Sequence, residues 1–258
     1  MNRDHPLWND AFPRANQYDA DWVMANEMGP NALWLTEWLC REMRLEPGMR
    51  VLDLGCGRAL SSVFLAREFG VQVWAADLWC KPTDNWARIR AAGLEDRIYP
   101  IEAEAHALPF AKGYFDAIVC VDAYIYFGTD DVYLSRLREY VVPGGEIGIV
   151  VPGLMREFEG GVVPEHLTRP QANGGVFWAP DCWSYHTADW WRDHWARTGL
   201  VEVTVADTMP DGVKHWIQFE HVKELTGAGR FPPDTEVFEA DGGRYLGFVR
   251  MVARRNDK

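Results

Sequence analysis

The sequence predicts an α/β protein built on a doubly wound, mainly parallel sheet. Two observations carry this prediction. Short apolar runs alternate with helical patterns in the middle of the chain, and glycines or Pro-Gly turns separate them. A parallel sheet covered by helices on both faces has near-continuous apolar strands of this kind. The expected strands are Arg50–Leu54, Val71–Ala76, Arg97–Ile101, Phe115–Val121 and Glu146–Val151.

Helices are expected between these strands. One spans about Leu60–Phe69 and is closed by Gly70, and a second spans about Asp84–Ala92 and is closed by Gly93. A third, from about Asp130 to Tyr140, precedes a Pro-Gly-Gly turn. Together these elements predict a sheet over residues 49–152.

The two flanking regions differ from the middle in their tryptophans. Of the 13 in the chain, four precede residue 50 and six follow residue 152. Asn31 is expected to N-cap a helix that carries Trp34 and Trp38. We therefore expect a helical N-terminal cap over residues 1–48, and over 153–258 the rest of the same fold with inserted lid elements. Helices are expected at about 187–198 and from 212, and strands at 200–206 and 245–253.

Composition excludes several classes of function. With 26 basic and 38 acidic residues, the formal net charge is −12, which disfavours nucleic acid and anionic membranes as partners. No apolar run is long enough to span a bilayer, and no signal segment is evident. The five cysteines are scattered without a CxxC pair and predict neither a metal site nor a disulfide framework. We expect a cytoplasmic protein, monomeric or homodimeric.

The strongest motif is the stretch Val51-Leu52-Asp53-Leu54-Gly55-Cys56-Gly57. It places a carboxylate near the end of a buried strand and two glycines in the turn to a helix, where a ligand can approach the backbone closely. A dinucleotide fingerprint needs a third glycine or alanine where Leu60 stands, and no phosphate-binding G-x-x-x-x-G-K-[ST] loop is present.

The motif resembles the first motif of the class I S-adenosylmethionine-dependent methyltransferases, of the small-molecule, methyltransferase-11-like type. Further matches follow in order: Asp77 at the end of the second strand, Glu104–Phe110 (EAHALPF), Phe115–Val119 (FDAIV) and Val142–Gly145 (VPGG). The chain departs from the family in having Ala59 where glycine is usual and Glu104 where aspartate is commoner. The similarity covers residues 48–152, about two fifths of the chain.

The resemblance implies a Rossmann-like sheet of seven strands and S-adenosyl-L-methionine as the cofactor. It implies that Asp77 holds the ribose hydroxyls and that the Glu104 segment faces the adenine. Tyr18 is expected to close over the methionine end. The expected cofactor-binding residues are Asp53, Gly55, Cys56, Gly57, Asp77, Leu78, Glu104, Ala105, Asp122 and Tyr18.

Three side chains are candidates for the chemistry. In similar enzymes, the loop after the fourth strand lies beside the transferable methyl group. Asp122 is expected there to orient an amine or accept a proton, and Tyr126 to line the pocket. His186 is the preferred general base, because histidine titrates near neutrality. Each has a purely structural alternative: a turn cap for Asp122, and packing at a helix start for His186.

The sequence favours methyl transfer to nitrogen or oxygen of a small aromatic or amine-bearing molecule. Methylation of carbon, a cyclopropane-synthase-like reaction on lipids and a cofactor-binding protein without catalysis stay open as alternatives. The substrate is not identified by the sequence.

Overall fold

The computed structural model describes residues 1–256 and contains one mixed sheet of seven strands in the order β3-β2-β1-β4-β5-β7-β6. The first five strands pair in parallel, whereas β7 runs antiparallel to both β5 and β6. The strands are β1 (Arg50–Leu54), β2 (Gln72–Asp77), β3 (Ile98–Glu102), β4 (Phe115–Val121), β5 (Val141–Leu154), β6 (Val201–Thr208) and β7 (Leu246–Arg255). The predicted fold class is confirmed.

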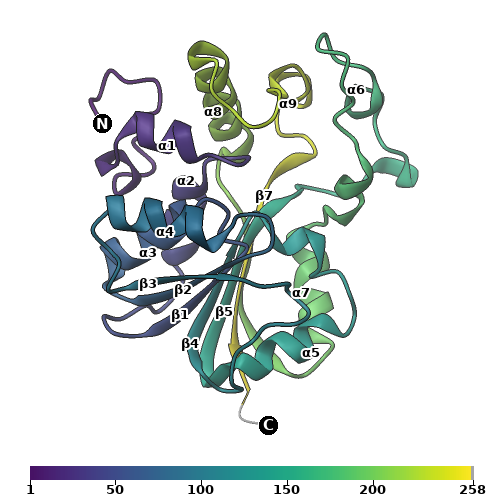
Figure 1. The fold of residues 1–258 in the computed structure, drawn as a ribbon. Coiled ribbons are helices and arrows are strands. Elements are labelled where there is room, and N and C mark those ends of the chain that lie inside the picture. Colours follow the sequence, from purple (N-terminus) through teal and green to yellow (C-terminus); the bar gives the residue numbers. More distant parts are fainter. Residues whose placement is uncertain (257–258) are drawn as a thin grey trace.

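Helices cover both faces of the sheet (Figure 1). One face packs against α2 (Ala32–Cys40), α3 (Leu60–Phe69), α4 (Pro82–Ala91) and α8 (Gly212–Thr226), and the other against α5 (Tyr133–Leu137) and α7 (Ala188–Ala196). Trp191 and Trp195 of α7 are fully buried against the second face. The C-terminal tryptophans of α7 are therefore core residues.

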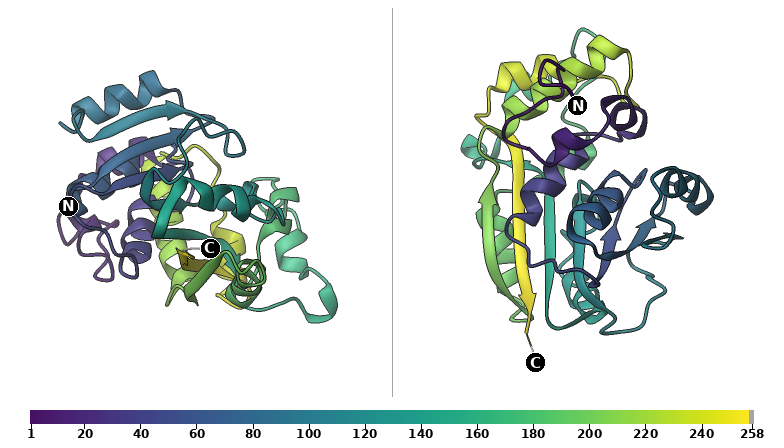
Figure 2. Two further views of the ribbon diagram at one scale, coloured as in Figure 1. Left: turned by 90° about the horizontal axis from the view of Figure 1, so that it is seen from below. Right: turned by 90° about the vertical axis from the view of Figure 1, so that its left-hand side faces the viewer.

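The N-terminal segment lies beside α8, far from it in sequence (Figures 1 and 2). The Asn9 amide contacts His215 and Gln218 of α8, and Phe12 packs edge-on against the His215 ring. This segment holds η1 (Ala15–Gln17) and α1 (Ala20–Asn26). Asn31 caps α2, as predicted, by accepting the backbone N–H groups of Leu33 and Trp34.

The segments between the longer elements of the C-terminal part hold short helices. They are η4 (Glu159–Gly161), α6 (Glu165–Thr168), η5 (Pro180–Ser184) and α9 (Thr235–Asp241), while η2 (Tyr124–Tyr126) and η3 (Arg138–Tyr140) flank α5. Within residues 1–256, every helix is too short or too polar to cross a bilayer.

Two expectations differ from the structure by more than two residues at an end. The helix expected over 130–140 is a five-residue α5 followed by η3. The strand expected at 146–151 extends from Val141 to Leu154, because its second half pairs with β7 all along its length. That pairing joins segments about a hundred residues apart, which local sequence patterns do not reveal.

Candidate active site

A cavity of about 270 Å³ opens at the carboxyl ends of β1, β2 and β4. In an open α/β sheet, ligands bind at this edge, where the connections on either side of the first strand diverge. Most of the predicted cofactor-binding residues line the cavity: Gly55, Cys56, Gly57, Asp77, Leu78, Glu104, Ala105 and Asp122. Asp53 and Tyr18 do not.

The turn after β1 gives the cavity its floor. Gly55 has a φ of +77°, and a Cβ there would lie 2.3 Å from the Cβ of Ala123. Only glycine fits this position without displacing the loop after β4. Ala59 adopts a φ of +65° just before α3, so the departure from glycine is accommodated at the modest cost of a left-handed residue.

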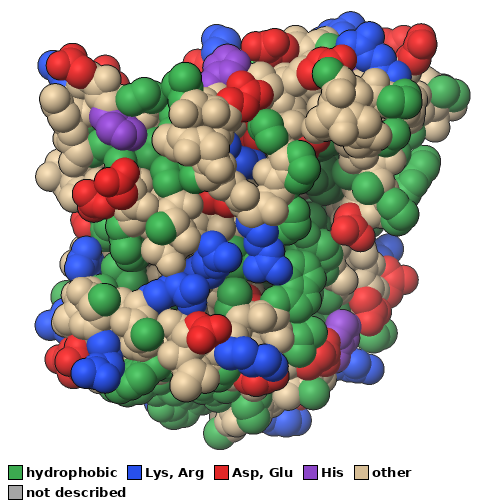
Figure 3. All heavy atoms as spheres, turned by 45° about the horizontal axis from the view of Figure 1, so that its top comes forward, with side chains coloured by type: hydrophobic (Ala, Val, Ile, Leu, Met, Phe, Trp, Pro, Cys, Tyr) green, Lys and Arg blue, Asp and Glu red, His purple; other side chains and the backbone are tan. Residues whose placement is uncertain are grey.

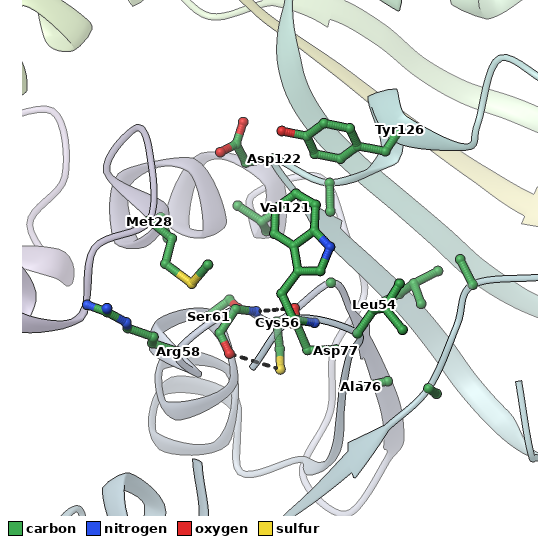
Figure 4. Close-up of a pocket in the computed structure, with 18 of the residues that line it drawn as sticks. Met28, Leu54, Cys56, Arg58, Ser61, Ala76, Asp77, Val121, Asp122 and Tyr126 are labelled. Atoms are coloured by element: carbon green, nitrogen blue, oxygen red, sulfur yellow. Dashed lines mark hydrogen bonds between the residues drawn. The ribbon is translucent and has the colours of Figure 1, made fainter. Parts of the chain in front are cut away.

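Asp77 connects this turn to the end of β2. One carboxylate oxygen accepts the backbone N–H of Gly57 at 2.8 Å (Figure 4), and the other accepts those of Trp79 and Cys80 at 2.8 and 2.7 Å. These bonds fix the carboxylate while it still faces the cavity. A carboxylate oxygen has further acceptor capacity, so Asp77 can also receive ligand hydroxyl groups.

Asp53 lies beneath the cavity rather than in its wall. It is fully buried and accepts the hydroxyl groups of Ser61 and Ser62 at 2.7 and 2.5 Å. Burial raises the pKa of Asp53 to about 6, and the two serine hydroxyls oppose that rise. Its contacts therefore tie β1 to the start of α3 and hold the glycine turn from below.

The far end of the cavity combines apolar and acidic groups. Leu78, Ala105 and Glu104 line it together with His106. The His106 ring lies 2.7 Å from one carboxylate oxygen of Glu104, and its backbone N–H donates to the other at 2.9 Å. The pKa of Glu104 is lowered chiefly by this contact with His106. The segment is thus a fixed acidic turn beside an apolar wall.

Asp122 follows β4 and projects into the cavity (Figure 4). Its φ of +60° is uncommon for a residue other than glycine, and strained backbone of this kind clusters at functional sites. A Cβ on Gly29 would lie 2.7 Å from Asp122 Oδ2, so the N-terminal segment packs directly against this carboxyl. Among residues 1–256 the carboxyl has no hydrogen-bond or ion-pair partner, and burial raises its pKa to about 8.

Tyr126 also lines the cavity, and its hydroxyl points toward Asp122 (Figure 4). Its ring meets that of Trp79 edge-on, with centroids 5.5 Å apart. Burial, followed by the charge of Asp122, raises the pKa of Tyr126 to about 12. Both rings are more than half exposed, so they form an aromatic rim at the mouth.

The structure places His186 and Tyr18 away from the cavity. The His186 ring stacks on Trp190 at 3.6 Å between centroids, and burial lowers its pKa to about 4. This packing at the start of α7 is the structural alternative, and we do not retain His186 as the general base. The Tyr18 hydroxyl donates to Glu68 at 3.1 Å, and its ring stacks on Phe64 of α3.

Sequence reasoning expected the N-terminal segment to contribute through Tyr18 and missed the residues of this segment that line the cavity. Met28 lies against Gly57, since a Cβ on that glycine would be 3.0 Å from the Met28 sulfur. Asn26, Met28, Pro30 and Ala32 all line the cavity, as do Arg58 and Ser61. The Gly29-Pro30 turn directly before the Asn31 cap was the available signal, but its partner Asp122 is far away in sequence.

These residues fit a methionine-bearing nucleoside. Asp77 offers a fixed carboxylate for hydroxyl groups, Leu78 and Ala105 offer an apolar wall, and Gly55 lets the ligand approach the backbone. Within residues 1–256, no cluster of His, Cys, Asp or Glu side chains is suited to a metal ion. The fold and the lining of the cavity together resemble those of a class I methyltransferase domain.

Comparison with known proteins shows the same similarity in the central part of the chain. Residues 51–145 match a family described as a methyltransferase domain. The methyltransferase GfsG of Streptomyces halstedii is 32% identical over 138 residues, covering 52% of this chain and 50% of that protein. Residues 51–145 are thus similar to a methyltransferase domain, and the chain spans about half the length of the curated relatives it matches first.

Solved structures extend the similarity of fold beyond the matched segment. Phosphoethanolamine N-methyltransferase 2 of Haemonchus contortus, in complex with S-adenosyl-L-methionine, has a TM-score of 0.70 at 17% identity, covering 92% of this chain and 56% of that one. The [4+2]-cyclase SpnF has a TM-score of 0.65 at 18% identity, covering 90% and 84%. At such identities the likeness concerns the fold alone.

Proposed function

We propose that the protein transfers a methyl group from S-adenosylmethionine to a nitrogen or oxygen atom of a small molecule. The observation that carries this proposal is the unpartnered carboxyl of Asp122 in the same cavity as the glycine turn and Asp77. When bound, the cofactor supplies an electrophilic methyl group on a sulfonium ion. The protein must align the acceptor, exclude water and take up a proton.

Asp122 is suited to the last of these tasks. Its pKa of about 8 lies within the range where a carboxyl group exchanges protons at neutral pH. In the charged form it attracts an ammonium group or a hydroxyl proton, and it can hold the proton that leaves the acceptor atom. Tyr126 is its neighbour and offers a hydroxyl for orienting the acceptor.

The aromatic rim favours a planar or cationic acceptor. Trp79 and Tyr126 present exposed ring surfaces beside Asp122. Ring faces attract both flat apolar molecules and ammonium groups. An amine or a phenol therefore agrees better with this half of the cavity than an isolated alkene of a lipid does.

The test is methyl transfer from methyl-labelled S-adenosylmethionine to a panel of small amines, phenols and carbon nucleophiles. We expect labelled amine or phenol products, and a rate at least ~100-fold lower for Asp122→Asn, as general-base catalysis contributes this much. Asp116→Asn is the matched control, because Asp116 also lies on the β4 segment but binds Arg50 outside the cavity. Tight cofactor binding without transfer to any acceptor would establish a binding protein instead.

A further inference from the structure

Three arginines from separate parts of the chain converge on the end of α1. Arg58, which follows the glycine turn, donates to the carbonyl of Ala25 at 3.0 Å. Arg88 of α4 donates to the side chain of Asn26 at 2.8 Å. The backbone N–H of Arg230, in the segment between α8 and α9, donates to Glu27 at 2.5 Å. Residues 25, 26 and 27 thus each accept a hydrogen bond from one arginine, from the guanidinium groups of Arg58 and Arg88 and from the backbone of Arg230.

The charges of the same three arginines also act on one side chain, the thiol of Cys80. Burial and then the charge of Asp77 raise the pKa of the Cys80 thiol. The guanidinium groups of Arg88, Arg230 and Arg58 act against this rise. All three positive charges therefore act on the same side chain.

None of the three guanidinium groups has a carboxylate partner within 4.0 Å in the part of the chain that the structure describes. Their contacts are with a carbonyl, with amide side chains and, for Arg230, with the ring of Phe231. Guanidinium groups that lack a carboxylate partner in the protein can bind an anion that comes from outside it. Figure 3 shows Lys and Arg side chains gathered near the middle of the face toward which the parallel strands run.

Glu27 lies among these arginines but does not neutralise them by pairing. It is 2% exposed, and its two carboxylate oxygens accept the backbone N–H groups of Gly29 and Arg230. Its role is to fasten the 227–234 segment onto the turn that touches Asp122. The position of Arg230 is therefore tied to the cavity wall.

The segment that carries Arg230 is also anchored at its other end. The backbone N–H of Asp234 donates to Glu220, which forms a buried ion pair with Lys223. The side chain of Gln171 donates to the Asp234 carboxylate at 2.7 Å. A buried polar network of this kind fixes the loop, and so the backbone of Arg230 is held beside Glu27.

We propose that Arg58, Arg88 and Arg230 form a receiving site for a carboxylate or phosphate group of the methyl acceptor, an inference that rests on the proposed function. Guanidinium groups bind such anions through paired, charge-assisted hydrogen bonds. Arg58 lines the same cavity as Asp122, whereas Arg88 and Arg230 lie outside its lining. The site therefore extends outward from the cavity, and the acceptor combines an anionic group with a methylated nitrogen or oxygen.

The first test needs no turnover. Inorganic phosphate is titrated into the isotope-labelled protein saturated with S-adenosylhomocysteine, and the arginine side-chain NMR signals report binding. We expect Arg58→Gln/Arg88→Gln/Arg230→Gln to raise the Kd for phosphate at least ~10-fold. The control Arg90→Gln/Arg97→Gln/Arg136→Gln removes the same charge from exposed positions and should change it less than ~2-fold.

Two outcomes of this titration overturn the proposal. If saturation with S-adenosylhomocysteine itself abolishes phosphate binding, the arginines hold the carboxylate of the cofactor. If the cluster variant binds phosphate as the wild type does, the site takes up an adventitious ion only. Thermal unfolding of both triple variants checks that each is folded.

The second test uses an acceptor found in the methyl-transfer panel. The cluster variant should raise KM at least ~10-fold for an acceptor bearing a carboxylate or phosphate, and leave KM of its neutral ester within ~2-fold. Equal effects on both overturn the proposal. Because the phosphate titration does not depend on catalysis, failure of the proposed methyl transfer is distinguishable from failure of the anion site.

Discussion

The two halves of the cavity differ in the hydrogen bonding of their carboxyl groups. At the end of β2, Asp77 accepts three backbone N–H groups and is held in a single position. At the end of β4, Asp122 has no partner among the described residues and sits on strained backbone. Both side chains line the same cavity. One carboxylate is satisfied before any ligand arrives, whereas the other is not.

This difference indicates a division of labour. A carboxylate fixed by backbone donors is a preorganised receptor, suited to a ligand that is the same in every reaction cycle. A carboxyl with a raised pKa and no partner carries a free-energy cost that a ligand can relieve. We expect the first to dominate cofactor affinity and the second to dominate turnover.

The largest expected effect is on cofactor affinity, in the half of the cavity that holds Asp77. Asp77→Ala should weaken binding of S-adenosylhomocysteine at least ~100-fold, because hydrogen bonds to a charged group contribute about 1.5–3 kcal/mol each. Isothermal titration calorimetry measures this, and Asp84→Ala serves as control because Asp84 is an exposed acid in the first turn of the next helix, α4. Unchanged affinity in Asp77→Ala would contradict the assignment of Asp77 to the ribose and the division of labour between Asp77 and Asp122.

In the half of the cavity that holds Asp122, we expect the rate of methyl transfer to depend on pH. With a pKa of about 8, the Asp122 carboxyl is charged in about one per cent of molecules at pH 6 and about one tenth at pH 7. If the charged form is the active one, kcat/KM rises about tenfold per pH unit below the midpoint and is level above it. A bound sulfonium favours the charged carboxylate, so that midpoint lies at or below 8.

The stability of the cofactor-free protein gives the matching control. A carboxyl whose folded-state pKa is raised binds its proton more tightly when folded, so stability falls as pH rises from about 4 to about 8. Asp122→Asn removes this dependence, and its melting temperature should exceed that of the wild type more at pH 8 than at pH 5. Parallel curves for the two proteins would show that Asp122 titrates normally.

Much of the half of the cavity that holds Asp77 could be predicted from the sequence. Strands β1 and β4 and helix α3 have the predicted bounds, because apolar runs and a closing glycine are local signals. Asp77 ends a buried strand, and the family resemblance assigned it to the ribose hydroxyls. The resemblance also implied that the loop with Asp122 lies beside the methyl group, but it could not show that Asp122 lacks a partner.

The contacts of the other half are long-range and were not predictable. Gly29 meets Asp122, and Glu27 binds Arg230, only because the N-terminal and C-terminal segments fold over the same edge of the sheet. His186 lies where the sequence expects a helix to begin, but the ring stacks on Trp190, four residues further along the chain. Local patterns give the position of a side chain in an element and not which way it turns.

A smaller effect, on stability, is expected at Asp53, which lies beneath the half of the cavity that holds Asp77. Ser62→Ala should lower the free energy of unfolding by about 1.5 kcal/mol or more at pH 7, because it removes one of two donors to the buried Asp53 carboxylate. Since the folded-state pKa of Asp53 is raised to about 6, the loss should shrink toward pH 4, where the carboxyl is protonated.

Urea denaturation with an unchanged m-value measures this loss. Ser135→Ala is the matched control, because the Ser135 hydroxyl bonds only a backbone carbonyl at an exposed site, and we expect less than about 0.5 kcal/mol there. An equal loss in both variants would mean that Asp53 does not depend on its serines.

The smallest expected effect concerns Tyr18, which the resemblance assigned to the cofactor. The structure buries its ring against α3 and directs its hydroxyl to Glu68. Tyr18→Phe should therefore change the affinity for S-adenosylhomocysteine less than ~2-fold and cost about 1 kcal/mol of stability for one hydrogen bond. Met28→Ala, in the cavity wall against Gly57, should weaken binding several-fold more. A loss of affinity in Tyr18→Phe as large as in Met28→Ala would mean that the N-terminal segment rearranges on binding. The half of the cavity that holds Asp77 would then not be preformed.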